Sequence, residues 1–271
     1  MSRRPPDAPR AKRSLGQNFL IDPKLQRAVV DVLAPGPEDE VLEIGPGQGA
    51  LTRHLVGRVR RLVLVEKDDV LAARLRDEFA AEPSVKVIHA DILEVRLESI
   101  SPASAELKVI GNIPYNITTP ILFSLLERRP RPRSIVLMVQ REVADRIVAA
   151  PGGKDFGALA VGVQTVAGAE RVLHVGRGAF RPVPKVESSV VRITPYDPPR
   201  LSEAEEAALR RLSRAAFGQR RKQFQRILRD AYTLSVEEVK RLEQQLGVDL
   251  QARPETFGPD QFVRLARALT G

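Results

Sequence analysis

Asn112-Ile113-Pro114-Tyr115 combines residue types that could methylate an aromatic amine. The lone pair of such a nitrogen is delocalised into the ring, so it is a poor nucleophile. The side-chain oxygen of Asn112 and the backbone carbonyl of Ile113 or Pro114 could accept its N–H groups and direct the lone pair towards a methyl donor. Proline restricts the backbone so that a carbonyl can point inward. Tyr115 offers a face on which a flipped base can stack, worth about 1–3 kcal/mol per base.

Taken alone, this segment also fits a turn in which Asn112 caps a helix and Pro114 begins it. Its position favours the chemical interpretation, because it follows the fourth buried strand, where a doubly wound sheet faces its ligand. The absence of cysteine agrees, since methylation of a pyrimidine carbon usually needs a thiolate and methylation of an amine does not.

A glycine-rich segment, Glu43-Ile44-Gly45-Pro46-Gly47-Gln48-Gly49, stands where the first strand meets its helix. Glycines there allow a tight turn and close approach of the backbone to a ligand. Gly45-x-Gly47-x-x-Ala50 fits the dinucleotide fingerprint of dehydrogenases. The third glycine, Gly49, and the strand-end Glu43, which can support the loop from below, favour S-adenosylmethionine. A glycine turn without a ligand is the plain alternative.

Two acids at strand ends complete a predicted nucleoside site. Glu66 ends the second strand, where its carboxylate could accept hydrogen bonds from both ribose hydroxyls. Asp91 follows the third strand, where it could accept a hydrogen bond from an adenine amino group. A glycine loop with these acids indicates a cofactor that carries a nucleoside.

Short apolar runs that alternate with helical patterns must position these residues. This alternation predicts an α/β, Rossmann-like fold with a parallel sheet wound on both sides. We also expect later strands at residues 158–166 and 188–194, as an antiparallel edge of the sheet. Expected strands are Val41–Ile44, Leu62–Val65, Val85–Ile88, Lys108–Ile110 and Ile135–Val139, and expected helices are 23–33 with Asp22 as N-cap and Pro23 first, 50–57, 68–80, 118–128 and 141–149.

The pattern becomes helical after a proline-rich segment, and a domain boundary is predicted at 196–201. Ser202-x-x-Glu205 and Ser235-x-x-Glu238 are capping boxes that open amphipathic helices. We therefore expect a disordered basic tail at 1–11, a methyltransferase domain at 12–196 and a small helical domain at 201–271.

Composition limits the function further. The chain has 271 residues, 43% of them hydrophobic, a net charge of +9, no cysteine and three histidines at wide spacing. Disulfides, thiolate nucleophiles and iron–sulfur clusters are excluded, and no metal site is expected. No apolar run reaches the ~18 residues of a membrane span. The sequence predicts a cytoplasmic protein without membrane association that binds polyanions.

A basic segment at 209–229 contains no acid and is the expected RNA-binding surface. Apolar residues recur there at helical spacing, which predicts helices joined at Gly218 with outward charges. A solvated charged face is the alternative. Its basic residues are Arg210, Arg211, Arg214, Arg220, Arg221, Lys222, Arg226 and Arg229, of which Arg220, Arg221, Lys222 and Arg226 are the predicted RNA contacts.

The motifs together resemble the ribosomal RNA adenine N6-dimethyltransferase family over about residues 12–270. The likeness continues at Phe180–Ser188, a match to F-x-P-x-P-K-V-x-S. Departures are Gln223–Arg226, where the family often has T-L-R-N, and Phe156, where tyrosine is common. The other matching segments are Leu15–Leu20 (G-Q-N-F-L), Glu43–Gly49 (E-I-G-P-G-x-G), Val65–Asp68 and Gly111–Pro120 (N-L/I-P-Y-N-I-x-T-P).

The resemblance implies dimethylation of two adjacent adenines in a hairpin loop near the 3′ end of small-subunit (16S) ribosomal RNA, by a monomer acting on the pre-30S subunit. S-adenosyl-L-methionine would be the cofactor and S-adenosyl-L-homocysteine its product. The acceptor side would comprise Asn112, Ile113, Pro114, Tyr115 and Phe180, with Tyr115 and Phe180 stacking on the base. The expected cofactor contacts are Gln17, Asn18, Leu20, Glu43, Gly45, Gly47, Gly49, Glu66, Lys67, Asp91, Ile92 and Asn112.

Alternative functions remain open at this point. Large-subunit enzymes that confer macrolide resistance share the methyl-transfer motifs, although Phe217–Lys222 and Arg253–Glu255 fit the small-subunit branch better. A non-catalytic RNA-binding assembly factor could keep the same fold. The dinucleotide fingerprint leaves a dehydrogenase as the third alternative.

Overall fold

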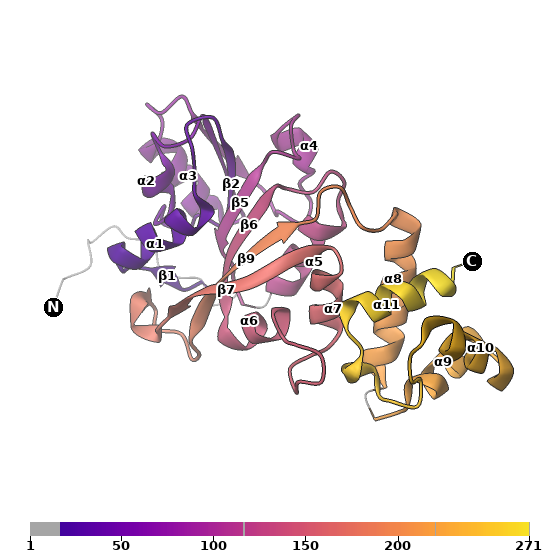
Figure 1. The fold of residues 1–271 in the computed structure, drawn as a ribbon. Helices are drawn as coiled ribbons and strands as arrows, with labels where there is room; N and C mark the ends of the chain where they lie inside the picture. Colours follow the sequence, from indigo (N-terminus) through magenta and orange to yellow (C-terminus); the bar gives the residue numbers. More distant parts are fainter. Residues whose placement is uncertain (1–16, 116, 220, 271) are drawn as a thin grey trace. The chain divides into compact units, whose positions relative to one another are not determined.

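The fold contains a mostly parallel sheet (Figure 1). The structure, a computed structural model, describes residues 17–115, 117–219 and 221–270. Within these residues the main sheet has seven strands in the order β4-β3-β2-β5-β6-β9-β7. The first five of these strands are parallel, and β9 runs antiparallel to β6. Their bounds are Val85–His89 (β4), Arg61–Glu66 (β3), Glu40–Ile44 (β2), Lys108–Asn112 (β5), Ser134–Gln140 (β6), Ser188–Pro195 (β9) and Ala167–Val175 (β7).

The predicted Rossmann-like α/β class is confirmed, and the five parallel strands lie where the apolar runs predicted them, to within two residues at each end. Val41, Leu42, Leu62 and Leu64 are fully buried although neighbouring residues of a strand point to opposite faces. Strands buried on both faces are characteristic of parallel sheets covered by helices. The strand expected at 188–194 is confirmed as β9 and is antiparallel, but it is not at the edge of the sheet, because β7 lies beyond it.

The helices of the first part of the chain begin close to their predicted positions. In α1, the side chain of Asp22 accepts hydrogen bonds from the backbone N–H groups of Lys24 and Leu25, and Pro23 occupies the first turn, as predicted. The helix expected at 50–57 is reduced to one turn, α2. The helices are α1 (Pro23–Leu33), α2 (Thr52–Leu55), α3 (Asp69–Glu78), α4 (Leu97–Ile100), α5 (Thr118–Glu127) and α6 (Arg141–Ile147).

The strand predicted at 158–166 was wrong, because this segment forms the helix α7 (Ala158–Gln164). Its residues are almost all apolar, and a short apolar run does not distinguish a buried helix from a buried strand by periodicity. Leu159, Ala160 and Val161 are all buried, so no polar face marked the helix. The next strand, β7, was not predicted because its buried residues do not alternate regularly.

The described part of the chain divides into two compact units. The first comprises the residues up to Ala144 together with Glu170–Thr194, and the second comprises Asp145–Ala169 with the residues from Pro195 onwards. The single predicted boundary at 196–201 did not anticipate that residues 145–169 belong with the C-terminal helices. They do so because α7 packs against α8 (Glu203–Gly218) and α11 (Pro259–Ala268).

The second unit is helical around an aromatic core. The Phe224 ring lies edge-on to Phe257, at 4.9 Å between centroids, and Phe217 stacks on Phe262 at 5.6 Å. Both predicted capping boxes are present, at the start of α8 and of α10. The remaining elements of the unit are α9 (Phe224–Tyr232), α10 (Val236–Leu246) and the 3-10 turn η3 (Pro254–Thr256).

A short antiparallel pair lies beside the main sheet of the first unit. β1 (Phe19–Leu20) pairs with β8 (Phe180–Arg181), which follows the 3-10 turn η2 (Arg177–Ala179), with Phe19 opposite Arg181 and Leu20 opposite Phe180. The backbone N–H of Ile21 extends the pair by donating to the carbonyl of Ala179, at 2.8 Å. Two motifs that are about 160 residues apart in the sequence are thereby neighbours in space.

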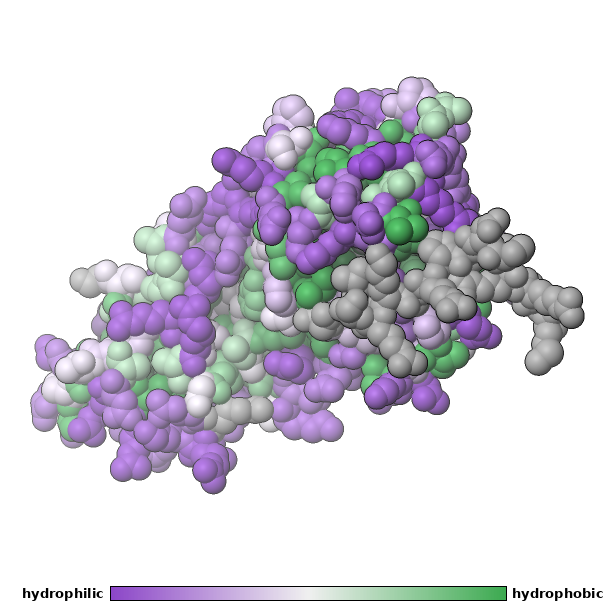
Figure 2. Space-filling model, turned by 180° about the vertical axis from the view of Figure 1, so that it is seen from behind, coloured by the Kyte–Doolittle hydropathy of each residue, from purple (hydrophilic) through white to green (hydrophobic). Residues whose placement is uncertain are grey.

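The surface is mainly hydrophilic on the face shown in Figure 2, as expected of a chain with 28% charged residues. In the described ranges no helix has the length and apolar character needed to cross a membrane. The same residues contain no group of three or more histidine, aspartate or glutamate side chains placed to hold a metal ion. The predicted tail at 1–11, and also Leu15, Gly16, Asn116 and Arg220, lie outside the described residues.

Candidate active site

A cavity of about 210 Å³ lies at the carboxyl ends of the parallel strands in the first unit. β2, β3 and β5 end there, and the segment after β4 contributes as well. Because parallel neighbours end at one edge of a sheet, residues far apart in the sequence meet there. The lining residues are Gln17, Asn18, Phe19, Leu20, Glu43, Ile44, Gly45, Pro46, Gly47, Gln48, Ala50, Leu51, Val65, Glu66, Lys67, Ala90, Asp91, Ile92, Asn112, Ile113, Pro114, Tyr115, Ile117 and Ile121.

The glycine loop needs glycine for its backbone and for space. Gly45, Gly47 and Gly49 have φ angles of 63°, 60° and 75°, in the left-handed region that side chains disfavour. A Cβ atom on Gly47 would also lie 3.1 Å from the ring of Phe19. Gly45 and Gly47 line the cavity, whereas Gly49 does not and instead shapes the turn into α2.

Glu66 is oriented by the loop beside it. One carboxylate oxygen accepts the backbone N–H of Gly47 at 3.0 Å, and the other accepts that of Asp68 at 2.9 Å. The side chain is 5% exposed, and this burial raises its pKa although both backbone donors act to lower it. Each oxygen keeps a second acceptor position, so the carboxylate can receive two further hydrogen bonds.

Glu43 lies beneath the loop and is almost completely buried, at 1% exposed. The hydroxyl of Thr52 donates to its carboxyl group at 2.7 Å. Burial raises the pKa of Glu43 to about 8, with the charge of Glu66 acting in the same direction. A neutral Glu43 therefore lies beneath the loop, at the position expected from its place at the end of β2.

Asp91 and Lys67 form an ion pair at the wall of the cavity, with 2.6 Å between Lys67 Nζ and Asp91 Oδ2. The other carboxylate oxygen of Asp91 accepts the backbone N–H of Leu93 at 3.0 Å. The hydrogen bond from Lys67 lowers the pKa of Asp91, and the pair raises the pKa of Lys67. Asp91 is therefore held as a carboxylate beside the cavity.

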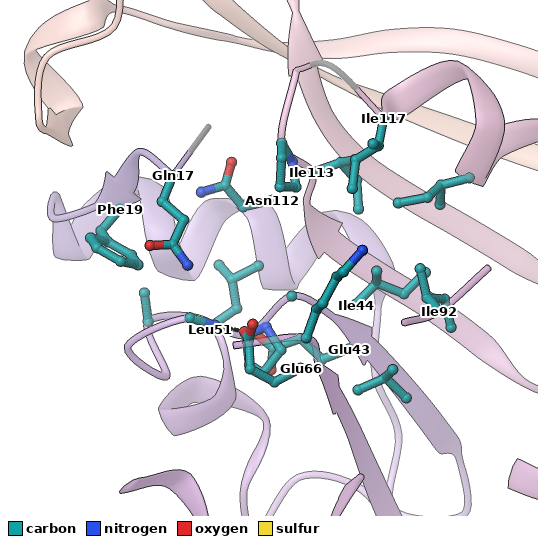
Figure 3. A pocket seen from close by; sticks show the side chains of 18 of the residues that line it. Gln17, Phe19, Glu43, Ile44, Leu51, Glu66, Ile92, Asn112, Ile113 and Ile117 are labelled. Atoms are coloured by element: carbon teal, nitrogen blue, oxygen red, sulfur yellow. Dashed lines mark hydrogen bonds between the residues drawn. The ribbon is translucent and has the colours of Figure 1, made fainter. Parts of the chain in front are cut away.

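Asn112 ends β5 and is anchored to the N-terminal segment. Its side-chain Nδ2 donates to the backbone carbonyl of Asn18 at 2.9 Å. A carbonyl can only accept, so the bond fixes which end of the amide faces Asn18 and leaves Oδ1 directed elsewhere. Figure 3 shows Asn112 between the segment that carries Gln17 and Phe19 and the segment that carries Ile113 and Ile117.

The backbone after Asn112 is also held in place. The N–H of Ile113 donates to the carbonyl of Met138 on β6 at 3.2 Å. The carbonyl of Pro114 accepts the N–H of Ile117 at 3.1 Å and the hydroxyl of Thr118 at 3.4 Å. These bonds form the turn that leads into α5, which begins at Thr118 with Ile117 at its N-cap position. The alternative in which Asn112 caps a helix and Pro114 begins it is therefore wrong, and the segment lines the cavity instead. Because the Pro114 carbonyl already accepts two hydrogen bonds, the carbonyl of Ile113 is favoured as the second acceptor.

Tyr115 is tied to β9, the antiparallel strand next to β6. Its hydroxyl and the hydroxyl of Ser188 are 2.8 Å apart. Burial raises the pKa of Tyr115, and the hydrogen bond with Ser188 opposes that rise. The phenol therefore stays protonated and acts as a fixed ring at the cavity wall.

Phe180 is not brought to the cavity with the other predicted acceptor residues. Its side chain is fully buried within the core cluster of the first unit, and its backbone pairs with Leu20. The stacking role expected of Phe180 stays a prediction, and in this structure its ring belongs to the same core cluster as Leu20 of β1.

The predicted RNA contacts lie in the second unit. Arg221, Lys222 and Arg226 are exposed, at the loop before α9 and on its first turn. Lys222 forms an ion pair with Asp230 at 3.0 Å. The helices predicted on either side of Gly218 are confirmed as α8 and α9, with their apolar residues buried in the core of the unit.

Several lining residues were not predicted. Phe19 has the clearest missed signal, because it is an aromatic residue inside the same motif as Asn18 and packs on Gly47. Gln48, Leu51, Ile117 and Ile121 were missed because turns and helix faces carry no strand-end signal.

The family model described as "Ribosomal RNA adenine dimethylase" matches residues 8–270. The chain belongs to this family. Members of the ribosomal RNA adenine dimethylase family are methyltransferases, which favours an S-adenosylmethionine-type cofactor over a dinucleotide in the cavity.

Curated relatives agree over nearly the full length. "Ribosomal RNA small subunit methyltransferase A" of Geobacter metallireducens is 41% identical over 263 residues, covering 96% of each chain. The protein of the same name from Chlorobium chlorochromatii is 43% identical and covers 94% of this chain and 92% of its own length.

Two solved structures share the fold. A dimethyladenosine transferase from Plasmodium falciparum has a TM-score of 0.79 at 22% identity, and the match covers 91% of the present chain and 95% of the Plasmodium chain. The 23S rRNA methyltransferase ErmE has a TM-score of 0.72 at 29% identity, covering 94% and 100%. The α/β sheet and the helical C-terminal region are features of both likenesses.

Proposed function

We propose that this protein transfers methyl groups from S-adenosyl-L-methionine to N6 of two adjacent adenines in a hairpin loop near the 3′ end of small-subunit (16S) ribosomal RNA, giving N6,N6-dimethyladenosine. The family match and the small-subunit relatives support this reaction. The observation that carries the chemistry is the anchored amide of Asn112, next to a fixed Tyr115 ring in one cavity.

The glycine-loop side of the cavity fits the proposed cofactor. Glu66 keeps acceptor positions for two ribose hydroxyls, Asp91 is a carboxylate suited to an adenine amino group, and Gly45 and Gly47 bring backbone rather than side chain to the ligand. When bound, the cofactor supplies an electrophilic methyl group on a sulfonium. Gln17, Asn18, Leu20, Lys67, Ile92 and Asn112, which also line the cavity, are proposed as further contacts, and Gly49 and Glu43 as supports of the loop.

The other side fits the amino group of adenine. Asn112 Oδ1 and the carbonyl of Ile113 are the proposed acceptors of its two N–H groups. Accepting both bonds withdraws the nitrogen lone pair from the ring and directs it. The methylated nitrogen is acidic, so it releases its proton without a strong base. Tyr115 provides the stacking face, at about 1–3 kcal/mol per base, and Phe180 would join it only by leaving its buried position.

RNA binding is proposed for Arg220, Arg221, Lys222 and Arg226. Neutralising Arg220, Arg221 and Lys222 together should weaken RNA binding, leave cofactor affinity unchanged and reduce the salt dependence of binding, because each lost phosphate contact changes the slope by about 0.7–0.9. Filter binding over a salt series measures this. A slope equal to that of the wild type would count against this surface.

The proposed partner is the pre-30S subunit, which places the protein in the cytoplasm, and the proposed active form is a monomer. Proteins usually recognise folded RNA by its shape and by unpaired bases that are splayed out, and the adenines of a hairpin loop fit this mode. Sedimentation of the free protein tests the monomer.

Methyl transfer to purified ribosomal subunits tests the function directly. Small subunits from a strain that lacks the modification should take up tritium from labelled S-adenosylmethionine to four methyl groups per RNA, and large subunits should take up none. Mass spectrometry of digested RNA identifies the product. Transfer to large subunits alone would instead support the ErmE-like reaction, and no transfer to either would support a non-catalytic factor. Calorimetry with NAD, where we expect no binding, tests the dehydrogenase alternative.

A further inference from the structure

The hydroxyl of Tyr115 has no part in stacking, since a phenylalanine ring stacks equally well. In this protein the hydroxyl is 2.8 Å from the Ser188 hydroxyl. The Ser188 side chain is fully buried, so the contact is shielded from competing water. Rotation of an aromatic ring about its Cβ–Cγ bond is otherwise a soft, two-fold motion. A hydrogen bond at the far end of the ring restricts that motion.

Ser188 is well placed to act as a fixed support. It is the first residue of β9 and pairs with Gln140, the last residue of β6. Because β9 is antiparallel, it begins at the edge where the parallel strands end. The preceding residue, Glu187, is held by Arg141 through a backbone bond of 2.9 Å and an ion pair of 2.6 Å.

We propose that Ser188 is a positioning residue that acts through the hydroxyl of Tyr115 and sets the plane on which the acceptor adenine stacks. The inference rests on the proposed function. Ser188 is not among the residues that line the cavity, so its loss should lower kcat and leave the affinity for S-adenosylmethionine unchanged.

The second methyl transfer should depend on Ser188 more than the first. Adenine offers two N–H groups to the acceptors at Asn112 and Ile113, whereas N6-methyladenine offers one. With one hydrogen bond fewer, the orientation of the methylated base relies more on stacking against Tyr115. A ring that is free to tilt should therefore let N6-methyladenosine accumulate.

A double-mutant cycle tests this with Ser188→Ala, Tyr115→Phe and the double variant, assayed on unmodified small subunits. Loss of one buried hydrogen bond predicts a decrease in kcat of about threefold to tenfold for Ser188→Ala. In the Tyr115→Phe background, Ser188→Ala should cost less than about twofold, because the bond is already gone. The ratio of N6-methyladenosine to N6,N6-dimethyladenosine should rise in both single variants.

Ser189→Ala is the matched control. Ser189 is the next residue of β9, is 1% exposed, and its hydroxyl has no hydrogen-bond partner in the part of the chain that the structure describes. Removing this hydroxyl should change neither kcat nor the product ratio. Thermal unfolding of each variant shows whether stability has changed.

The outcomes separate the inference from the proposed function. Additive losses in both backgrounds, an equal loss in Ser189→Ala, or full activity of Ser188→Ala would overturn the role of Ser188 while wild-type transfer stands. A wild-type protein that transfers no methyl group to small subunits would overturn the proposed function, and the positioning role with it.

Discussion

The two sides of the cavity are held by contacts of different range. On the glycine-loop side, the N–H of Gly47 reaches Glu66 across 19 positions of sequence, between neighbouring parallel strands. On the other side, Asn112 is bound to Asn18 across 94 positions, and Tyr115 to Ser188 across 73. The first side forms once β2 and β3 pair, whereas the second also needs β1 and β9 in place. Changes on the first side should therefore act on cofactor binding, and changes on the second on turnover.

The largest expected effect is that of Asn112→Ala. Removing the oriented acceptor should lower kcat by about 10²- to 10³-fold, as for loss of one preorganised hydrogen-bonding group in other active sites. Affinity for S-adenosylmethionine, measured by calorimetry, should fall by less than about tenfold. A small decrease is expected because Asn112 is also a proposed cofactor contact. Equal losses in affinity and kcat would erase the distinction between the two sides.

Glu66→Ala should show the reverse behaviour. Loss of the carboxylate that accepts the ribose hydroxyls should weaken cofactor affinity by about 10- to 100-fold, as expected for hydrogen bonds to a charged group. At saturating cofactor, kcat should stay within about threefold. Glu82→Ala, at an exposed position, is the control and should change neither value. A large fall in saturated kcat would mean that Glu66 also shapes the acceptor side.

Glu43 makes stability on the glycine-loop side depend on pH. Its pKa is raised to about 8 by burial, against ~4.3 for an ordinary glutamate. The folded state thus prefers the protonated form, so this contribution is fully present below pH ~4.3 and is lost as pH rises through about 8. Relative to Glu43→Gln, which stays neutral, wild-type stability should fall by up to about 1.4 kcal/mol per pH unit in that window.

Urea unfolding of the cofactor-free protein at pH 5, 6.5 and 8.5 measures this difference. The kcat of Glu43→Gln with saturating cofactor should resemble the wild type, because the residue lies beneath the loop. Parallel stability curves for the two proteins would show that Glu43 is charged in the folded state.

Lys67→Leu should have the smallest effect. Without Lys67 the pKa of Asp91 rises, because the hydrogen bond that lowers it is lost. The decrease in cofactor affinity on acidification should then begin at a higher pH, with a change of no more than about threefold at neutral pH, as for an exposed ion pair. Cofactor titrations between pH 4 and 7.5 test this. If cofactor affinity falls at the same acidic pH in Lys67→Leu and in the wild type, Lys67 does not tune Asp91.

Much of the first unit could be predicted because its strands are buried runs and its helices carry local signals. Asp22 and Pro23 marked the start of α1, and β2 to β6 appeared as apolar runs between helical patterns. α7 was misassigned because its apolar residues Leu159, Ala160, Val161 and Val163 are all buried, so neither a helical nor an alternating pattern appears in its sequence. Burial on all sides removes the polar positions on which periodicity depends.

The site residues likewise divide into those that local sequence could predict and those that it could not. Glu66, Asp91 and Asn112 were predictable as strand-end residues, since the ends of parallel strands converge. The bonds of Asn112 to Asn18 and of Tyr115 to Ser188 were not, because nothing in the local sequence states which distant residue a side chain will meet. Phe180 illustrates the limit, since its motif predicted a role in stacking and the structure places its ring in the core.

The anchor of Asn112 has a consequence for the kinds of mutation the protein tolerates. The acceptor is the main-chain carbonyl of Asn18, which every residue at that position would retain. Point substitutions at position 18 therefore leave that acceptor in place, whereas an inserted or deleted residue in β1 shifts its pairing with β8 and turns alternate side chains to the opposite face. The orientation of the Asn112 amide is thus robust to substitutions in this segment and sensitive to changes in its length.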